Sequence, residues 1–379
     1  MNQGKSTEEV TAVKPTVQIA SSPQYHDRHS TARIMWTVSA CLLPATIWGV
    51  YVFGVRALWV VLASIGASVL SEYLAGLPLR RFTLRDGSAV LTGLLIGMNM
   101  PPAVPFFIPV IASVFAIVVV KWTFGGLGSN WMNPALAGRV FVFFSWTRHM
   151  TTWTMPRTLP VPDGFSSATY LGIVKTGVAE STGATGGPLA FLRAANFPNS
   201  QLDTKVTDWL NTVILQPLGI DVPYGYVDPF VGNIPGSIGE ISALLLMVGA
   251  VVLFAKKIIT WEIPAAYFLS FGILTWVFGG TIYGQGAFSG DVLFHVLSGG
   301  FMLAIFFMAT DMVTSPVTRK GLLIYGAGAG FLTFLIRTYG SFPEGASLAI
   351  ILMNVFVPLI NRVTKPSRFG VQKTREAET

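Results

Sequence analysis

Ten apolar runs, some of them interrupted by Gly or Pro, constrain this chain more than any other feature. An apolar run of about 20 residues crosses a bilayer as a helix, because each backbone polar group there needs a partner within the protein. Hydrophobic residues make up 52% of the 379 residues, charged residues only 11%, and the mean hydropathy is +0.59. Soluble proteins of this length do not have such a composition. We therefore expect an all-α polytopic membrane protein with about ten transmembrane helices.

The runs form two groups of five, separated by a long polar stretch. They begin near Ile34, Ala57, Ser88, Val104 and Met132, and then near Gly239, Glu262, Val292, Gly321 and Glu344. This predicts five domains, which are an N-terminal tail (1–33), a first five-helix repeat (34–146), an extracytoplasmic loop (147–238), a second five-helix repeat (239–361) and a C-terminal tail (362–379).

Basic residues at the ends of the runs orient the helices. By the positive-inside rule, the side that is rich in Lys and Arg faces the cytoplasm. Arg56 and Arg337 fall on the opposite side. The cytoplasmic side carries Arg28, Arg33, Arg80, Arg81, Arg85, Lys121, Lys256, Lys257, Arg319, Lys320, Arg362, Lys365 and Arg368. We expect both termini in the cytoplasm and the 147–238 loop outside it.

The two halves look like distant copies with broken helices. In the first half an apolar run ends at Pro101-Pro102, and in the second a run around Ser298-Gly299-Gly300 ends near Asp311. An odd number of helices in each half makes the two copies run in opposite senses across the membrane. Proteins built from inverted repeats bind ions or cofactors where their helices break.

The richest break extends from Phe124 to Arg139 and contains Asn130 and Asn133. Residues three apart on a helical turn face the same way, and amides suit the polar edge of a flavin or a quinone. Helix capping by Asn and close packing of small residues explain the same pattern without a ligand. The residues alone leave both interpretations open.

Carboxylates at membrane depth are costly, so each is a candidate for a function. The carboxylates within or at the ends of the apolar runs are Glu72, Asp86, Glu240, Glu262, Asp311 and Glu344. Asp86 beside Arg85 and Glu262 beside Trp261 are expected nearer the membrane surface. Glu72, Asp86 and Asp311 are retained as the candidates for a cation path.

Several classes of site are excluded or disfavoured. Cys41 is the single cysteine, so this chain alone cannot hold a cysteine-ligated iron-sulfur cluster or form an internal disulfide. The formal charge of +7 comes from residues that flank apolar runs, so we expect a lipid bilayer and no nucleic acid as its partner. We expect no catalytic acid-base residues, no metal ligands and no dinucleotide-binding fingerprint.

The polar stretch contains Asp163-Gly164-Phe165-Ser166-Ser167-Ala168-Thr169. This string matches the signature at which a flavin transferase links the phosphate of FMN to a threonine hydroxyl, so Thr169 is the expected attachment residue. Asp163, Gly164, Ser166, Ser167 and Ala168 complete the motif. Thr185 also follows a small residue, but Ala179 stands where Thr169 has Asp163. Thr185 is therefore the reserve.

Nearly the whole chain resembles the family that contains the D subunit of the Rnf complex and the B subunit of the sodium-pumping NADH:quinone oxidoreductase, Nqr. The resemblance is carried by SSPQYHDRHSTARIM, LRDGSAVLTGLLIGMNMPP, KWTFGGLGSNWMNPALAGR, DGFSSAT, GNIPGSIGE, MATDMVTSPVTRKG and RTYGSFPEGASLAIILMN. It implies a covalent FMN on Thr169 and a second, non-covalent flavin, either riboflavin or FMN, at Asn130, Asn133 and Asp311.

The resemblance also implies a function in a bacterial or archaeal cytoplasmic membrane. We expect a subunit of a ferredoxin:NAD+ oxidoreductase of the Rnf type, which passes electrons through its flavins and is coupled to the export of Na+ or H+. Its partners would be the other Rnf subunits and the flavin transferase. Two alternatives remain, the Nqr B subunit and a channel or permease for a small solute.

Overall fold

The computed structural model describes residues 30–80, 83–159, 166–179, 186–219, 221–342 and 344–365. Five of its helices are long and apolar enough to cross a membrane. Four further apolar helices of 10–17 residues accompany them, which are those covering Ser88–Met98, Phe107–Trp122, Pro134–Ser145 and Ala243–Ala255. The expected helical membrane protein is thus confirmed, although half of the expected spans are short or broken.

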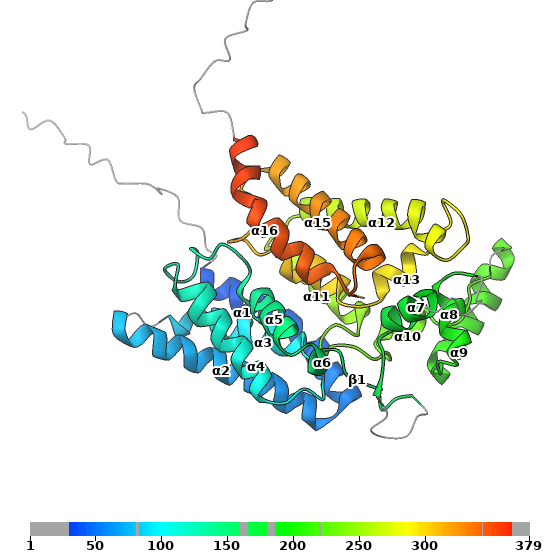
Figure 1. The fold of residues 1–379 in the computed structure, drawn as a ribbon, viewed down its shortest axis with the longest axis horizontal. Coiled ribbons are helices and arrows are strands. Elements are labelled where there is room, and N and C mark those ends of the chain that lie inside the picture. Colours follow the sequence, from blue (N-terminus) through cyan, green and yellow to red (C-terminus); the bar gives the residue numbers. More distant parts are fainter. Residues whose placement is uncertain are drawn as a thin grey trace, which may run out of the picture.

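The first half consists of two long helices followed by shorter ones (Figure 1). Its elements are α1 (Thr31–Phe53), α2 (Val55–Leu79), the 3-10 turn η1 (Leu84–Asp86), α3 (Ser88–Met98), α4 (Phe107–Val114), its π-helical continuation η2 (Phe115–Trp122) and α5 (Pro134–Ser145). Gly54 separates α1 from α2 with φ at +86°, and a Cβ there would lie 2.3 Å from the guanidinium carbon of Arg157. The tight turn between the first two helices therefore depends on glycine.

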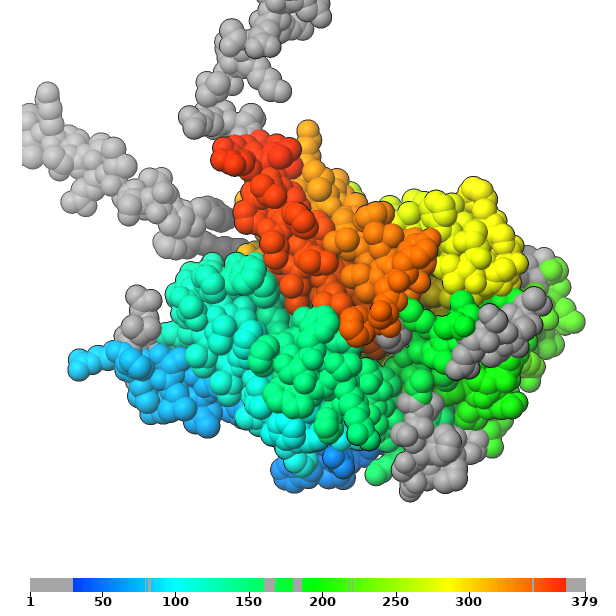
Figure 2. Space-filling model, in the orientation of Figure 1, coloured from blue at the N-terminus to red at the C-terminus, as the bar shows by residue number. Residues whose placement is uncertain are grey.

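The segment 147–238, expected as an extracytoplasmic loop, contains several short helices. It contains α6 (Thr147–Met150), α7 (Tyr170–Ala179), α8 (Pro188–Ala194), α9 (Gln201–Leu210), the turns η3 (Asn211–Leu215) and η4 (Gln216–Leu218), and α10 (Val227–Val231). It also contains two short strands, β1 (Trp153–Thr154) and β2 (Ser166–Ser167), which pair antiparallel. The expected all-α class holds, because these strands are only two residues long. Figure 2 shows this green segment against both the teal end of the first half and the orange helices of the second.

The second half again combines long helices with a broken one. Its elements are α11 (Ala243–Ala255), α12 (Glu262–Ile282), α13 (Val292–Leu297), α14 (Phe301–Leu303), η5 (Ala304–Met308), α15 (Arg319–Tyr339) and α16 (Ala346–Val363). Helices α12 and α15 lie side by side (Figure 1), and a Cβ on Gly330 would lie 2.5 Å from the carbonyl oxygen of Tyr267. Glycine thus allows the two backbones to pack closely.

Side-chain caps mark the starts of several helices. Ser30, Asn133, Ser242, Asp291 and Thr318 each accept a hydrogen bond from a backbone N–H in the first turn of the helix that follows. Such caps satisfy donors that have no partner within the helix. The largest difference between an expected and an observed start is that between Gly239 and Ala243.

The two halves meet at their breaks. The N–H of Ile238 donates to the carbonyl of Met100 (3.1 Å), and that of Gly239 donates to the carbonyl of Met98 (2.8 Å). The segment before α11 therefore closes over the end of α3. The third apolar run of the second half is broken between α13 and α14, whereas that of the first half forms the single helix α3. The inverted repeat and the five-domain division stay predictions.

Candidate flavin sites

Thr169 lies between β2 and α7 and caps that helix. Its Oγ1 accepts a hydrogen bond from the N–H of Gly172 (3.1 Å), and its carbonyl accepts one from the N–H of Ile173 (2.9 Å). The side chain is only 4% exposed. The hydroxyl that the motif singles out is therefore held at the N-terminus of a ten-residue helix.

The rest of the motif is only partly described. The backbone of Ser166 and Ser167 forms β2, and Ala168 is exposed between this strand and Thr169. Asp163, Gly164 and the reserve residue Thr185 lie outside the described residues.

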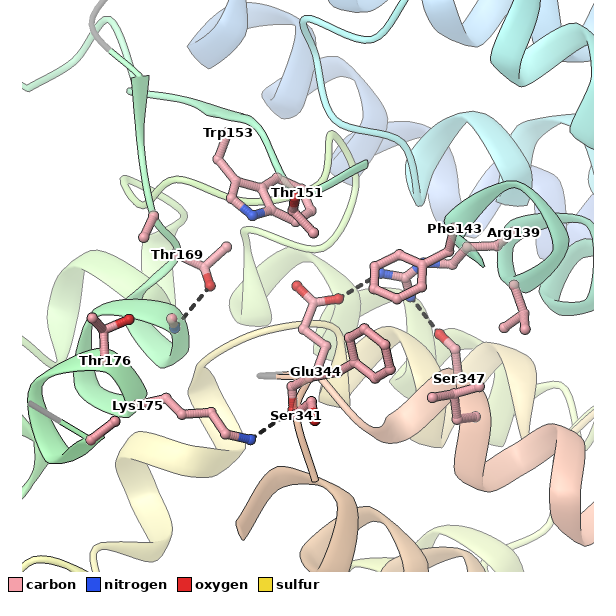
Figure 3. Close-up of a pocket in the computed structure, with 16 residues that line it drawn as sticks. Arg139, Phe143, Thr151, Trp153, Thr169, Lys175, Thr176, Ser341, Glu344 and Ser347 are labelled. Atoms are coloured by element: carbon pink, nitrogen blue, oxygen red, sulfur yellow. Dashed lines mark hydrogen bonds and ion pairs between the residues drawn. The ribbon is translucent and has the colours of Figure 1, made fainter. Parts of the chain in front are cut away.

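Thr169 lines a cavity of about 520 Å³ (Figure 3). Phe143 of α5, Trp153 of β1 and Phe342 supply aromatic walls, and Lys175 of α7 and Glu344 supply charged groups. This volume lies within the range of about 300–1,000 Å³ that is usual for ligand pockets. The cavity is therefore large enough for an aromatic cofactor, and all three parts of the chain contribute to it.

Two features make this cavity favourable for a phosphate. The first is the N-terminus of α7, where backbone N–H groups and the helix dipole attract anions. The second is Lys175, whose Nζ donates to the carbonyls of Arg337 (3.1 Å) and Phe342 (3.0 Å). Burial lowers the pKa of Lys175 from its ordinary value.

Arg139 binds two carboxylates at one side of this cavity. Its Nη1 lies 3.1 Å from Glu240 Oε1, and its Nη2 lies 2.5 Å from Glu344 Oε2. Nη1 also donates to the hydroxyl of Ser347. The sequence analysis did not predict this cluster. A usable signal was present, because one Arg and two Glu stand at the edges of apolar runs, where charges need partners.

A second cavity, of about 110 Å³, brings together three residues that were predicted from different parts of the chain. Asn130, Asn133 and Asp311 all line it. Asn133 Oδ1 caps α5 by accepting from the N–H groups of Ala135 (3.0 Å) and Leu136 (3.3 Å). The expected capping role of Asn133 is thus confirmed, and this role leaves its Nδ2 available to a partner elsewhere.

Some polar groups in the wall of this second cavity have hydrogen-bond partners, and one does not. Nδ2 of Asn133 donates to the carbonyl of Met308 (3.4 Å) in the other half, and Asp311 accepts from the N–H of Val313 and the hydroxyl of Thr314. Within the described part of the chain, the buried Oδ1 of Asn130 has no hydrogen-bond partner. An unsatisfied acceptor in a cavity wall suits a ligand with an N–H or O–H donor.

The other two predicted carboxylates have protein partners. Both oxygens of Glu72 lie 2.9 Å from Nζ of Lys121, which also donates to the hydroxyl of Ser88 (2.7 Å). Asp86 Oδ1 accepts from the N–H (2.8 Å) and the hydroxyl (2.6 Å) of Ser88. Glu72 is thus buried in an ion pair, and its role in a cation path stays a prediction.

This arrangement of apolar helices, with two polar-lined cavities where the halves meet, is that of a multi-pass membrane protein. The chain belongs to the NQR2, RnfD, RnfE family, whose model matches residues 18–370. The expected resemblance is thereby confirmed.

Three relatives illustrate the similarity. The D subunit of the proton-translocating ferredoxin:NAD(+) oxidoreductase complex of Clostridium ljungdahlii is 40% identical over 357 residues, which cover 94% of this chain and 96% of the relative. The D subunit of the Na(+)-translocating ferredoxin:NAD(+) oxidoreductase complex of Acetobacterium woodii is 40% identical over 361 residues, with the same coverage. The D subunit of the ion-translocating oxidoreductase complex of Stutzerimonas stutzeri is 40% identical over 347 residues, covering 90% of this chain and 93% of the relative.

Proposed function

We propose that the chain is the flavin-carrying D subunit of an ion-translocating ferredoxin:NAD+ oxidoreductase complex of the Rnf type. The relatives in Clostridium and Acetobacterium carry this description, and they match almost the full length of this chain. In this proposal ferredoxin and NAD+ bind other subunits, and electron transfer is coupled to the movement of Na+ or H+. One relative is named for protons and another for Na+, so the ion is left open.

The single observation that carries this proposal is the place of Thr169, at a helix N-terminus and in the wall of the large cavity. FMN attached there would supply one-electron redox chemistry. The hydroxyl oxygen of Thr169 would carry the phosphate of that FMN. The first N–H groups of α7 would face the phosphate oxygens, and Lys175 would contribute positive charge.

The aromatic walls of the same cavity have a separate role. Trp153, Phe143 and Phe342 exclude water and offer flat surfaces to a ring system. They would hold such a ring in the cavity that Arg139 and Glu344 also line.

A second, non-covalent flavin, riboflavin or FMN, is proposed at Asn130, Asn133 and Asp311. The unsatisfied Oδ1 of Asn130 accepts from a ring N–H in this proposal, and the carboxyl of Asp311 offers a further polar contact. The cavity of about 110 Å³ accommodates the polar edge of such a ring and is smaller than usual ligand pockets of about 300 Å³ or more.

Two other functions fit part of the same evidence. The Nqr B subunit belongs to the same family, and the proteins that copurify with this chain distinguish it from its Rnf counterpart. A permease would use the cavities between the halves for a solute, but it would have no use for a flavinylation motif. The nearly full-length match to relatives that are D subunits favours the Rnf function over both.

The test is to find the flavin on the chain. The denatured protein, coexpressed with a flavin transferase, should fluoresce on a gel under ultraviolet light, and the peptide with Thr169 should carry the mass of one FMN. Thr169→Ala should abolish both signals. Thr176→Ala, which removes another hydroxyl from the same cavity, should keep both. FMN on Thr185 would keep the function and move the site, whereas an unmodified chain would overturn the covalent carrier.

A further inference from the structure

The Arg139 cluster has more negative than positive charge in direct contact. One guanidinium binds two carboxylates, Glu240 on one terminal nitrogen and Glu344 on the other. The side chains of Arg139 and Glu240 are less than one-tenth exposed, and that of Glu344 is 16% exposed. When two carboxylates share one site, ionising the second is disfavoured, and one of them readily holds a proton.

Each carboxylate also has one oxygen that the ion pairs do not use. Among the described residues, Glu240 Oε2 and Glu344 Oε1 are buried without a hydrogen-bond partner, and the hydroxyl of Ser237 lies next to the Glu240 carboxylate. Buried polar atoms are nearly always partnered, so these two oxygens are available to a proton or a water molecule. A proton on either carboxylate turns an acceptor into a donor, which these neighbours can then accept.

The Arg139 cluster borders the cavity of Thr169. Glu344 lines that cavity, and in Figure 3 one oxygen of its carboxylate is turned away from Arg139. Glu344 and Glu240 also line a small cavity of about 10 Å³ beside Thr169, which is about the space of one water molecule. Glu344 therefore stands between the large cavity and the deeper Glu240.

Other charged and titratable groups lie around the cluster on neighbouring elements. The guanidinium of Arg337 approaches from α15, donating to the carbonyls of His295 and Ser298 and lying 5.3 Å from the ring centroid of Phe271. Lys175 faces the large cavity from α7, and the phenol of Tyr170 is buried beside the cluster.

We propose that Glu240 and Glu344, bridged by Arg139, form a proton-binding pair that serves the Thr169 cavity. The proton enters from water in the large cavity, is taken up at Glu344 Oε1 and is held there or at Glu240 Oε2. Its role rests on the proposed function. One electron delivered into the cavity by a one-electron donor of the complex adds one negative charge, and one proton on the pair cancels it.

The first test needs no flavin. The chain is purified from a host without a flavin transferase, and infrared difference spectra are recorded between low and high pH. The wild type should lose a protonated-carboxyl C=O band as the pH rises, and Glu240→Gln and Glu344→Gln should each remove or shift that band. Glu262→Gln is the matched control, because Glu262 is a buried glutamate that faces Arg319 and has one unpartnered oxygen, yet it does not line either cavity. It should leave the band unchanged.

The second test uses the flavin-loaded chain. In the wild type, the midpoint potential of the covalent flavin should fall as the pH rises. If each electron brings one proton to the pair, the fall is up to about 59 mV per pH unit, which is a tenfold change in the equilibrium constant for reduction. Glu240→Gln and Glu344→Gln should flatten this slope, and Glu262→Gln should keep it.

The outcomes are separable. A wild-type infrared spectrum identical to that of the Glu240→Gln/Glu344→Gln double variant would overturn the proton-binding pair. If one variant does not fold, the wild type and the other variant still decide the result. Unchanged slopes in both Gln variants would overturn the coupling to the cavity. A chain without FMN on Thr169 would overturn the proposed function while leaving the infrared result valid.

Discussion

Arg139 and Glu344 lie 205 residues apart in the chain and meet with 2.5 Å between Nη2 and Oε2. Together with the contact from Arg139 to Glu240, this ion pair joins α5 of the first half to the start of α16 in the second half. Its place beside the cavity of Thr169 links the packing of the halves to the candidate cofactor site.

Arg139→Met should therefore destabilise the protein strongly. It leaves two buried carboxylates without their cation, which typically costs about 3–5 kcal/mol. Thermal unfolding in detergent measures the loss, and Arg148→Met, which removes an exposed arginine from α6, should change the midpoint little. An unfolding midpoint of Arg139→Met equal to that of Arg148→Met would show that the cluster does not stabilise the contact between the halves.

Lys121→Met should be more harmful than the double substitution Glu72→Gln/Lys121→Met. The single change leaves the buried carboxylate of Glu72 without its cation, whereas the double change removes both charges. The yield of folded protein and its unfolding midpoint report the difference. If Glu72 acts in a cation path, the double variant will fold and yet fail to move the ion in vesicles. Full ion transport by that variant would remove Glu72 from the path.

Lys175→Met should make the midpoint potential of the covalent flavin more negative. Removal of a positive charge from the cavity disfavours the added electron, and about 1.4 kcal/mol corresponds to 59 mV for a one-electron couple. We expect a change on the order of 50 mV. Lys205→Met removes an exposed lysine from α9 and should leave the potential unchanged.

The effect of Lys175 on the midpoint potential of the covalent flavin should also depend on pH. Because burial lowers the pKa of Lys175, this side chain loses its proton at a lower pH than an ordinary lysine. As the pH rises, the wild-type potential should therefore fall toward that of Lys175→Met. A constant gap between the two potentials across the alkaline range would contradict a lowered pKa.

Asn130→Ala and Asn133→Ala should differ in their effect on stability. Asn133→Ala removes the cap of α5 and should cost about 1 kcal/mol. Asn130→Ala removes one long hydrogen bond to the carbonyl of Met132, which lowers the free energy of unfolding. It also removes a buried side-chain carbonyl that has no partner among the described residues, which raises it. The net change in stability should therefore be small. Both variants should retain less of the flavin that acid denaturation releases. Undiminished release from Asn130→Ala would place the second flavin elsewhere.

Gly330→Ala should separate α12 from α15. A Cβ there meets the hydroxyl of Ser270 at 2.0 Å and the carbonyl of Tyr267 at 2.5 Å, and overpacking of this kind costs about 1–3 kcal/mol. Gly66→Ala in α2 is the matched control, because a Cβ at Gly66 meets nothing within 4 Å. The two unfolding midpoints should differ, and the midpoint of Gly66→Ala should be at or above that of the wild type.

Local signals explain which parts of the fold could be predicted. Helix starts are marked by caps such as Asn133 and Asp291, and apolar runs fix the membrane helices. The helices between residues 147 and 238 could not be predicted in the same way. Helix α9, for example, follows the cap Ser200 but lacks an apolar run, and buried carboxylates such as Asp203 help to fix its position.

The residues of the candidate sites also differ in how well the sequence alone could predict them. Thr169, Asn130 and Asn133 stand in local motifs, whereas the Arg139–Glu344 contact depends on how distant segments pack. Sequence spacing carries no information about a contact between residues 205 positions apart. The pairing of Glu72 with Lys121, 49 positions away, escaped prediction for the same reason.

At each cavity a polar contact joins the two halves. It is the hydrogen bond from Asn133 to Met308 at one cavity and the ion pair of Arg139 with Glu344 at the other. Lys175 in turn ties the helix that follows Thr169 to carbonyls of the second half. Any sliding of one half against the other would therefore strain both cavities together. The two candidate cofactor sites therefore share one region of contact between the halves.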